Sequence, residues 1–281
     1  MQQPAEQNIN IKRFDPSRLG KETTILLIGK RNTGKSTLLR DLMYHMKDKL
    51  DFGVLMSPTE EATGDMKDLL PAPCIYNSFN STAVDVLLDV QKQTVKTGNF
   101  KSVFLITDDC MYDKKVMKTP QMRAIFMNGR HRKLFYINCM QYMMDLGPEL
   151  RCNTDYVFAL RENIISNRAK LHQFFFGMFD TLGSFSKVFD KCTQGYECMV
   201  LDNTVRSNNV EDCVFWYQAE HNLPKFRMCK PVYWRLSDKY NRDDDDDDQP
   251  VVGVAERALL KNSANKTGLT IVKEGKKPSF F

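Results

Sequence analysis

The sequence lacks the cysteine pattern of a disulfide-stapled or zinc-stapled protein. Its eight cysteines are scattered along 281 residues, and no two of them form a C-x-x-C pair. A chain of this length can bury a core without cross-links. We therefore expect reduced thiols, mostly in the core, in a cytosol-like compartment.

Long apolar runs and a secretory leader are also missing. No apolar run approaches the roughly 20 residues that cross a bilayer, and residues 1–10 are polar. They do not show the charged-then-apolar pattern of a signal peptide. We expect neither a membrane span nor a secretory leader, and we find no internal repeat.

Positive charge exceeds negative charge outside one short acidic run. The net charge is +5, but residues 243–248 are six consecutive aspartates, and without them it would be +11. Such a basic body suits a polyanionic partner, although a generic basic protein would show the same balance.

Strand-like and helix-like segments alternate through the first 160 residues. This βαβ rhythm predicts an α/β protein with a mostly parallel sheet and helices on both faces. After it we expect a helical, Phe-rich segment over 162–191 and a hairpin of two further strands. The predicted strands cover 23–28, 52–56, 74–79, 102–107, 134–138, 156–160, 197–201 and 214–218, and the predicted helices cover 36–48, 64–69, 82–96 and 121–128.

A phosphate-binding loop follows the first of these strands. Residues 29–36 fit the pattern G-x-x-x-x-G-K-[ST], with an apolar strand before them and a helix after them. In this motif, backbone N–H groups cradle a polyphosphate, Lys35 reaches its outer phosphates, and the Ser36 hydroxyl can bind Mg²⁺. We expect nucleotide binding by Gly29, Lys30, Arg31, Asn32, Thr33, Gly34, Lys35, Ser36 and Thr37.

Two carboxylates end a later apolar strand. Asp108 and Asp109 follow Val103–Thr107, and P-loop NTPases need an acid at such a strand tip to hold Mg²⁺. We assign Asp108 to the metal and Asp109 to the attacking water as general base. At least one strand lies between the loop and these acids, which favours the additional-strand class of P-loop ATPases over the kinase–GTPase layout.

Basic and amide residues flank the next strand. Arg130 and Arg132 precede it and could supply an arginine finger to a neighbouring subunit, or could form a solvated loop or contact DNA phosphates. Gln141 follows it, and we assign it to sensing the γ-phosphate or the water, with Asn138 as the second candidate. An amide there could equally cap a helix.

With the run Leu-Gly-Pro-Glu-Leu-Arg-Cys-Asn-Thr-Asp-Tyr at 146–156, this order of motifs resembles the genome-packaging ATPases of large cytoplasmic DNA viruses. These poxvirus-type ATPases belong to the FtsK–HerA superfamily, and the resemblance covers about residues 23–217. It implies a RecA-like core, ATP and Mg²⁺ as ligands, a homo-oligomeric ring, and translocation of double-stranded DNA into a capsid. It also implies capsid or membrane-vertex partners, and a location at the assembly site in the host cytoplasm or in the virion.

The resemblance assigns the finger to Arg130, Arg132 or Arg151 without choosing among them. It also has one departure, because the superfamily usually carries Asp-Glu where this chain has Asp108 and Asp109. The shorter second side chain must still reach the water.

Two other functions remain open. A GTPase-like switch should carry an Asn-Lys-x-Asp motif, which is absent, and Asp180–Gly183 mimics a D-x-x-G element in the wrong topological place. A nucleoside or nucleotide kinase could use Arg130 and Arg132 as lid arginines, but the extra strand argues against it. We expect a flexible arm over 1–20, a P-loop ATPase domain over 21–240, and an acidic run with a disordered tail over 241–281.

Overall fold

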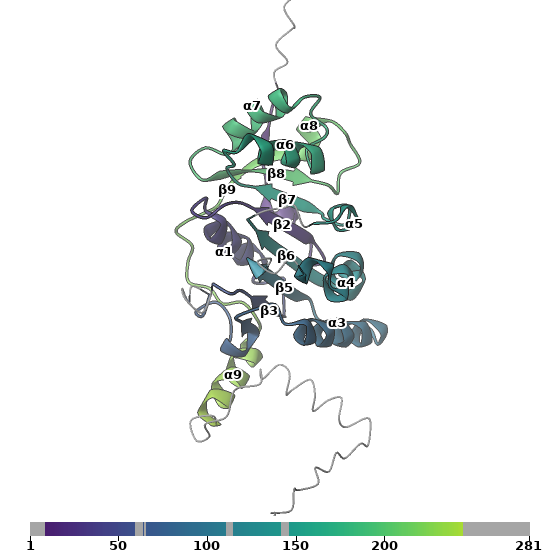
Figure 1. Cartoon of the computed structure of the whole chain (residues 1–281). Helices are drawn as coiled ribbons and strands as arrows, with labels where there is room; N and C mark the ends of the chain where they lie inside the picture. The colour runs from purple at the N-terminus through teal and green to yellow at the C-terminus, as the bar shows by residue number, and fades with distance from the viewer. Residues whose placement is uncertain (1–8, 60–63, 65, 111–114, 142–145, 244–281) are drawn as a thin grey trace, which may run out of the picture.

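One nine-stranded sheet organises the chain (Figure 1). The structure is a computed structural model and describes residues 9–59, 64, 66–110, 115–141 and 146–243. The strands occur in the order β1-β9-β8-β7-β2-β6-β5-β3-β4. Their bounds are β1 Lys12–Arg13, β2 Thr24–Ile28, β3 Phe52–Met56, β4 Ile75–Tyr76, β5 Val103–Asp108, β6 Leu134–Met140, β7 Tyr156–Ala159, β8 Glu197–Asp202 and β9 Val214–Gln218.

The sheet is mostly parallel, as predicted. Strands β2 to β7 pair in parallel, whereas β8 runs antiparallel to both β7 and β9 and gives the expected hairpin. Strand β2 precedes the phosphate loop, and β5 ends in the two acids. The strand that lies between them in the sheet is β6, which comes after β5 in the chain. Strand β4 is shorter than the predicted 74–79: the 3-10 turn Ala72–Cys74 takes its first residue, and residues 77–79 lie outside the strand.

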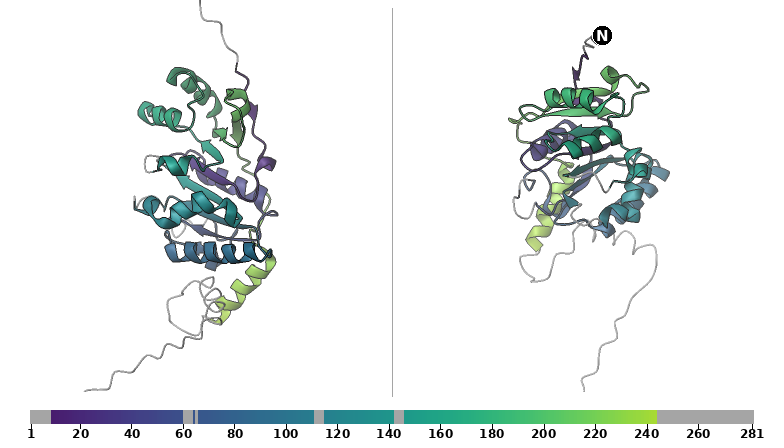
Figure 2. Two further views of the ribbon diagram at one scale, coloured as in Figure 1. Left: turned by 90° about the vertical axis from the view of Figure 1, so that its right-hand side faces the viewer. Right: turned by 45° about the horizontal axis from the view of Figure 1, so that its top comes forward.

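Helices cover both faces of the sheet (Figures 1 and 2). The buried strands are continuous apolar runs, as expected where both faces are covered. One face packs against α1 (Lys35–Met46) and the chain around Phe226–Cys229. The other packs against α3 (Ser81–Lys96), α4 (Pro120–Asn128), α5 (Pro148–Arg151), α6 (Ile165–Phe174) and α7 (Leu182–Cys192).

Residues 9–20 do not behave as the flexible arm that we expected. Strand β1 pairs with β9, and the 3-10 turn Pro16–Arg18 follows it. Phe14 is 2% exposed, and Leu19 is buried with it. This stretch of the chain is therefore part of the folded body, because the apolar Phe14 side chain packs into the core although the surrounding segment is polar.

Two other predicted elements differ from the structure, and some observed helices were not predicted. The expected helix over 64–69 lies partly outside the described residues, and 66–69 form turns. The expected helical segment 162–191 breaks into α6 and α7, and Phe175 and Phe176 between them are buried in the core. The short helices α5 and α8 (Val210–Cys213) and the C-terminal helix α9 (Pro231–Asp243) had no counterpart among the predictions. The latter extends three residues into the expected tail, whose remainder lies outside the described residues.

The cysteines lie mostly in the core, as predicted, since seven of the eight are buried and only Cys152 is exposed. In the described part of the chain, no helix is long and apolar enough to span a bilayer.

Candidate functional site

The loop after β2 has the backbone that a phosphate cradle requires. Asn32 and Gly34 both have positive φ, at 63° and 93°. A Cβ on Gly29 would lie 2.7 Å from Leu160 Cδ1, so a larger residue would not fit there. The Thr33 hydroxyl donates to the Lys30 carbonyl at 2.7 Å and closes the loop. The loop therefore curls tightly enough to turn its N–H groups toward one point.

Helix α1 begins where this loop ends. Gly34 is its N-cap, and no side chain caps the first turn. Lys35 is 8% exposed, while Ser36 on the next position is exposed. The N–H groups of the first turn and the positive end of the helix dipole are thus available to an anion.

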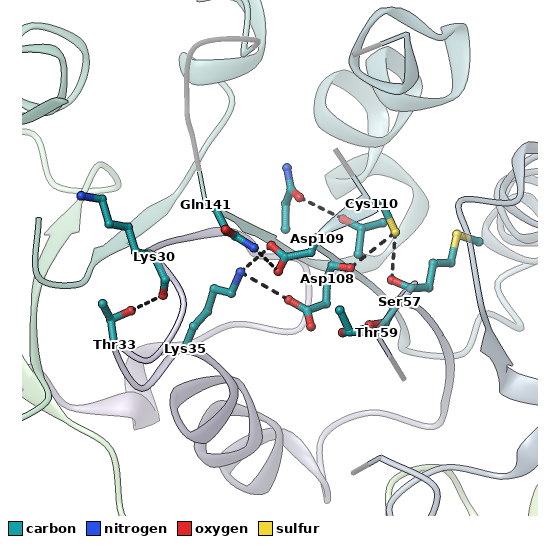
Figure 3. A network of polar contacts seen from close by, with 12 residues as sticks. Lys30, Thr33, Lys35, Ser57, Thr59, Asp108, Asp109, Cys110 and Gln141 are labelled. Atoms are coloured by element: carbon teal, nitrogen blue, oxygen red, sulfur yellow. Dashed lines mark hydrogen bonds and ion pairs between the residues drawn. The ribbon is translucent and has the colours of Figure 1, made fainter. Parts of the chain in front are cut away.

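Four predicted residues meet beside this turn (Figure 3). Lys35 Nζ lies 2.5 Å from Asp109 Oδ1 and 3.8 Å from Asp108 Oδ1. Gln141 Nε2 donates to Asp109 Oδ2 at 2.7 Å. The residues come from three neighbouring strand ends, because β2, β6 and β5 are adjacent and parallel.

Asp109 owes its position to an unusual backbone. Its φ is 50°, in the left-handed region, and its N–H donates to the Cys139 carbonyl at 3.1 Å. This turn points the short carboxylate back at Lys35, so the side chain reaches the centre of the site without the extra methylene of glutamate. A left-handed non-glycine residue is rare and concentrates at functional sites.

Cys110 fastens the same strand tip to β3. Its thiol donates to the Met56 carbonyl at 3.0 Å, and the side chain is fully buried. Burial and the neighbouring Asp108 raise the pKa of this thiol to about 12, so it stays a neutral donor.

Asn138, the second candidate for the sensor, does not reach this cluster. It is fully buried in the core, and its Oδ1 accepts from the Thr107 hydroxyl at 3.1 Å. Alternate residues of a strand point to opposite faces, and Cys139, its neighbour in β6, packs on the α1 side. Asn138 therefore faces away from α1 and Lys35.

Glu162 is a residue of this site that the sequence analysis did not single out. Its carboxylate pairs with Lys30 at 2.5 Å and accepts from the Ile164 N–H and from Asn167. Burial disfavours the charged form, but these hydrogen bonds, that of Lys30 foremost, outweigh it and lower the pKa of Glu162. The signal in the sequence was weak, an acid two residues after a buried strand. Glu162 ties the phosphate loop to the start of α6.

The three candidate arginines lie apart from this cluster. Arg130 pairs with Asp155, which also accepts from the Thr24 N–H at 2.8 Å. Thr24 begins β2 and the phosphate loop follows its end, so the five residues of the strand separate them, a span of about 15 Å. Burial raises the pKa of Asp155 against the opposing effect of Arg130.

Arg132 and Arg151 have other partners. Arg132 donates to the Leu88 carbonyl at 2.5 Å. Arg151 donates to the Leu146 carbonyl at 2.5 Å, and its guanidinium lies 4.0 Å from the Phe174 ring centroid. Within the described residues, none of the three arginines contacts Lys35, Asp108 or Asp109.

Comparison with known proteins gives relatives in large DNA viruses. The chain is 36% identical over 243 residues to the uncharacterized protein L437 of Acanthamoeba polyphaga mimivirus, covering 82% of this chain and 85% of the relative. It is also 36% identical over 207 residues to the uncharacterized protein 088R of Invertebrate iridescent virus 3, covering 73% and 78%. No protein-family model matches the chain.

A solved structure has the same fold. The genome-packaging NTPase B204 of Sulfolobus turreted icosahedral virus 2, in complex with AMPPCP, aligns with a TM-score of 0.52 at 15% identity. The alignment covers 72% of this chain and all of that one. This likeness shows a common P-loop NTPase fold.

Proposed function

The chain belongs to a protein family of large DNA viruses, and we propose that it is a poxvirus-type genome-packaging ATPase of the FtsK–HerA superfamily, an ATP-driven DNA motor. It hydrolyses ATP and uses the energy to move double-stranded DNA into a capsid during virion assembly. The observation that carries this proposal is the convergence of Lys35, Asp108, Asp109 and Gln141 at one edge of the sheet.

The geometry supports a separate role for each of these residues. Backbone N–H groups of the loop 29–36 and of the first turn of α1 would bind the phosphates. Lys35 would exchange its contact with Asp109 for the outer phosphates. Asp109 would then be free to accept a proton from the attacking water, which Gln141 would orient.

Mg²⁺ fits the oxygen donors that the site offers. The Ser36 hydroxyl is exposed at the start of α1, and the Asp108 carboxylate is 14% exposed beside Lys35. Hydroxyl and carboxylate oxygens are the ligands that Mg²⁺ prefers. Ser36 and Asp108 would hold it, and its charge would offset that of the transferring phosphate.

Arg130 is the best candidate for a finger donated across a subunit interface. Its side chain is 66% exposed, and its partner is a carboxylate that it can exchange for a phosphate. Arg132 and Arg151 are instead bound to backbone carbonyls. Because Arg130 lies near the opposite edge of the sheet from Lys35, it would act on the site of a neighbour. We therefore propose a homo-oligomeric ring.

The partners of such a ring would be DNA and the viral shell. The basic composition suits the DNA backbone, and capsid or membrane-vertex proteins would anchor the motor. Its work would take place at the assembly site in the host cytoplasm or in the virion.

The decisive experiment measures ATP hydrolysis with and without double-stranded DNA at several salt concentrations. We expect DNA to stimulate hydrolysis, and Lys35→Ala to abolish it because the outer phosphates lose their cation. Stimulation should fall with salt, since neutralising about six phosphates costs roughly 10³-fold in affinity between 50 and 200 mM. Lys47→Ala, a change in a partly exposed lysine at the end of α1, is the control.

Two outcomes would contradict the motor. A protein that hydrolyses ATP at the same rate with and without DNA would be an ATPase of another kind. Transfer of phosphate to a nucleoside instead of water would identify a kinase.

A further inference from the structure

Tyr196 lies at the same edge of the sheet as the phosphate loop. Strand β7 is level with both neighbours, since Ala159 pairs with Ile28 on one side and with Met199 on the other. Strand β8 runs antiparallel to β7, so the chain just before Met199 extends past the same edge that residues 29–36 occupy. Tyr196 is therefore placed beside the loop by the register of the sheet.

This residue is also on the side away from the carboxylates. In the sheet, β8 and β7 lie on one side of β2, while β6 and β5 lie on the other. Asp108 ends β5, while Asp109 and Gln141 follow β5 and β6, and these residues mark the end of the site where the outer phosphate would be cleaved. The rest of a nucleoside triphosphate must extend in the opposite direction, toward β7 and β8 (Figure 1).

Tyr196 closely approaches the phosphate loop at Gly34. A Cβ built on Gly34 would lie 3.4 Å from Tyr196 Cδ1 and 3.7 Å from its Cβ. Gly34 is the N-cap of α1, at the point where the inner phosphates would lie. The aromatic side chain thus borders the cradle itself.

The ring is held in place yet open to solvent. Tyr196 is 62% exposed, which is unusual for a large aromatic residue of a folded domain. Its φ is 68°, in the left-handed region that glycine or asparagine would adopt with less strain. The turn is fixed by two hydrogen bonds, from the Glu197 N–H to the Gln194 carbonyl at 2.9 Å and from Gln218 Nε2 to the Gly195 carbonyl at 3.1 Å.

A second exposed ring stands next to it. The centroid of His221 lies 6.4 Å from that of Tyr196, with the planes at 85°. This edge-to-face contact steadies the tyrosine and leaves ring surface available for stacking.

We propose that Tyr196 is the stacking platform for the nucleotide base, with His221 as its positioning residue. The inference rests on the proposed binding of a nucleoside triphosphate and adds how its base is recognised. Because stacking uses the face of the ring and reads no hydrogen bonds, the site favours purines over pyrimidines by ring area.

The test compares ATP with inorganic triphosphate, which has the phosphates but no base, by calorimetric titration in the presence of Mg²⁺. Tyr196→Ala should weaken ATP binding about tenfold, as expected for loss of one stacked base, and leave triphosphate binding unchanged. Tyr196→Phe should bind both ligands like the wild type. The control Phe100→Ala removes another exposed aromatic, which precedes β5 at its other end, and should change neither affinity.

Two results would overturn the proposal. Unchanged ATP binding by Tyr196→Ala would exclude stacking, and equal weakening of ATP and triphosphate would mean that the ring only supports Gly34. Failure of the proposed nucleotide site would give a different result from failure of the stacking proposal. A wild type that binds neither ligand would contradict the phosphate site itself, and so would a Lys35→Ala variant that binds both normally.

Discussion

Asp109 has two partners at once, and its neighbours explain why a short carboxylate serves here. Its left-handed backbone turns the side chain toward Lys35 on one side and Gln141 on the other. In this state the lysine that should bind phosphate is neutralised by the residue that should activate water. In the proposed mechanism, nucleotide binding would break this ion pair and so release Asp109 to act as general base.

Replacing Asp109 with asparagine should separate binding from hydrolysis. We expect Asp109→Asn to lower the rate of ATP hydrolysis by about 10²–10⁴-fold, since the amide cannot accept the proton. ATP affinity should stay the same or increase, because Lys35 no longer has a competing carboxylate. Single-turnover hydrolysis and calorimetric binding measure the two effects.

A matched variant is Asp89→Asn, a change of an exposed aspartate on α3, which should alter neither quantity. A hydrolysis rate that survives in Asp109→Asn would assign the base to another residue.

At the scale of elements, the short β1 segment is integral to the fold. Phe14 follows β1 and packs edge-to-face against aromatic rings of β7 and β9 at centroid distances of 5.3–6.0 Å, namely Tyr156, Phe158, Phe215 and Tyr217. The segment that contains β1 and Phe14 thereby packs against the part of the sheet that includes the β8–β9 hairpin.

Removing the Phe14 ring should destabilise the whole domain. We expect Phe14→Ala to lower the free energy of unfolding by about 3 kcal/mol, the usual cost of a buried phenylalanine. Chemical denaturation followed by circular dichroism measures it, and Phe100→Ala, whose ring is 43% exposed, should cost less than 1 kcal/mol. Equal stability of the two variants would mean that residues 9–20 contribute little to the fold.

At the scale of the whole molecule, the proposed ATP site would draw its residues from opposite ends of β2, in two different subunits. Lys35 lies beyond the end of β2, and Arg130 lies near its beginning. One copy of the chain cannot bring them together, whereas a ring can place the Arg130 edge of one subunit against the Lys35 edge of the next.

Mixing two inactive variants tests this division. Arg130→Ala should lower hydrolysis about 10³-fold, and Lys35→Ala should abolish it. Mixed together, they should recover activity that neither has alone, because some interfaces pair an intact Lys35 with an intact Arg130. ATP hydrolysis after co-assembly on DNA is the readout.

Arg132→Ala and Arg151→Ala are the comparisons, since their guanidinium groups are bound to carbonyls of their own chain. If one of them, and not Arg130→Ala, complements Lys35→Ala, the finger belongs to that residue.

The sequence by itself determined the fold class, the family and the inner half of the site. Buried parallel strands are continuous apolar runs, so β2, β5 and β6 could be recognised from the sequence. The polar residues at their ends then predicted a phosphate loop after β2, two acids at the end of β5 and an amide after β6. The α/β fold and the family are confirmed. The structure brings Lys35, Asp108, Asp109 and Gln141 together, and their catalytic roles stay predictions.

Only the tertiary structure decided which distant residues lie next to one another. The neighbours of β2, the pairing of Arg130 with Asp155, the contact of Lys30 with Glu162 and the place of Tyr196 beside Gly34 join residues 25 to 162 positions apart in the sequence. Local pattern fixes the period of a strand or helix, but it carries no record of which distant segments pair. That choice is made when the sheet order and register bring the strand ends to one edge.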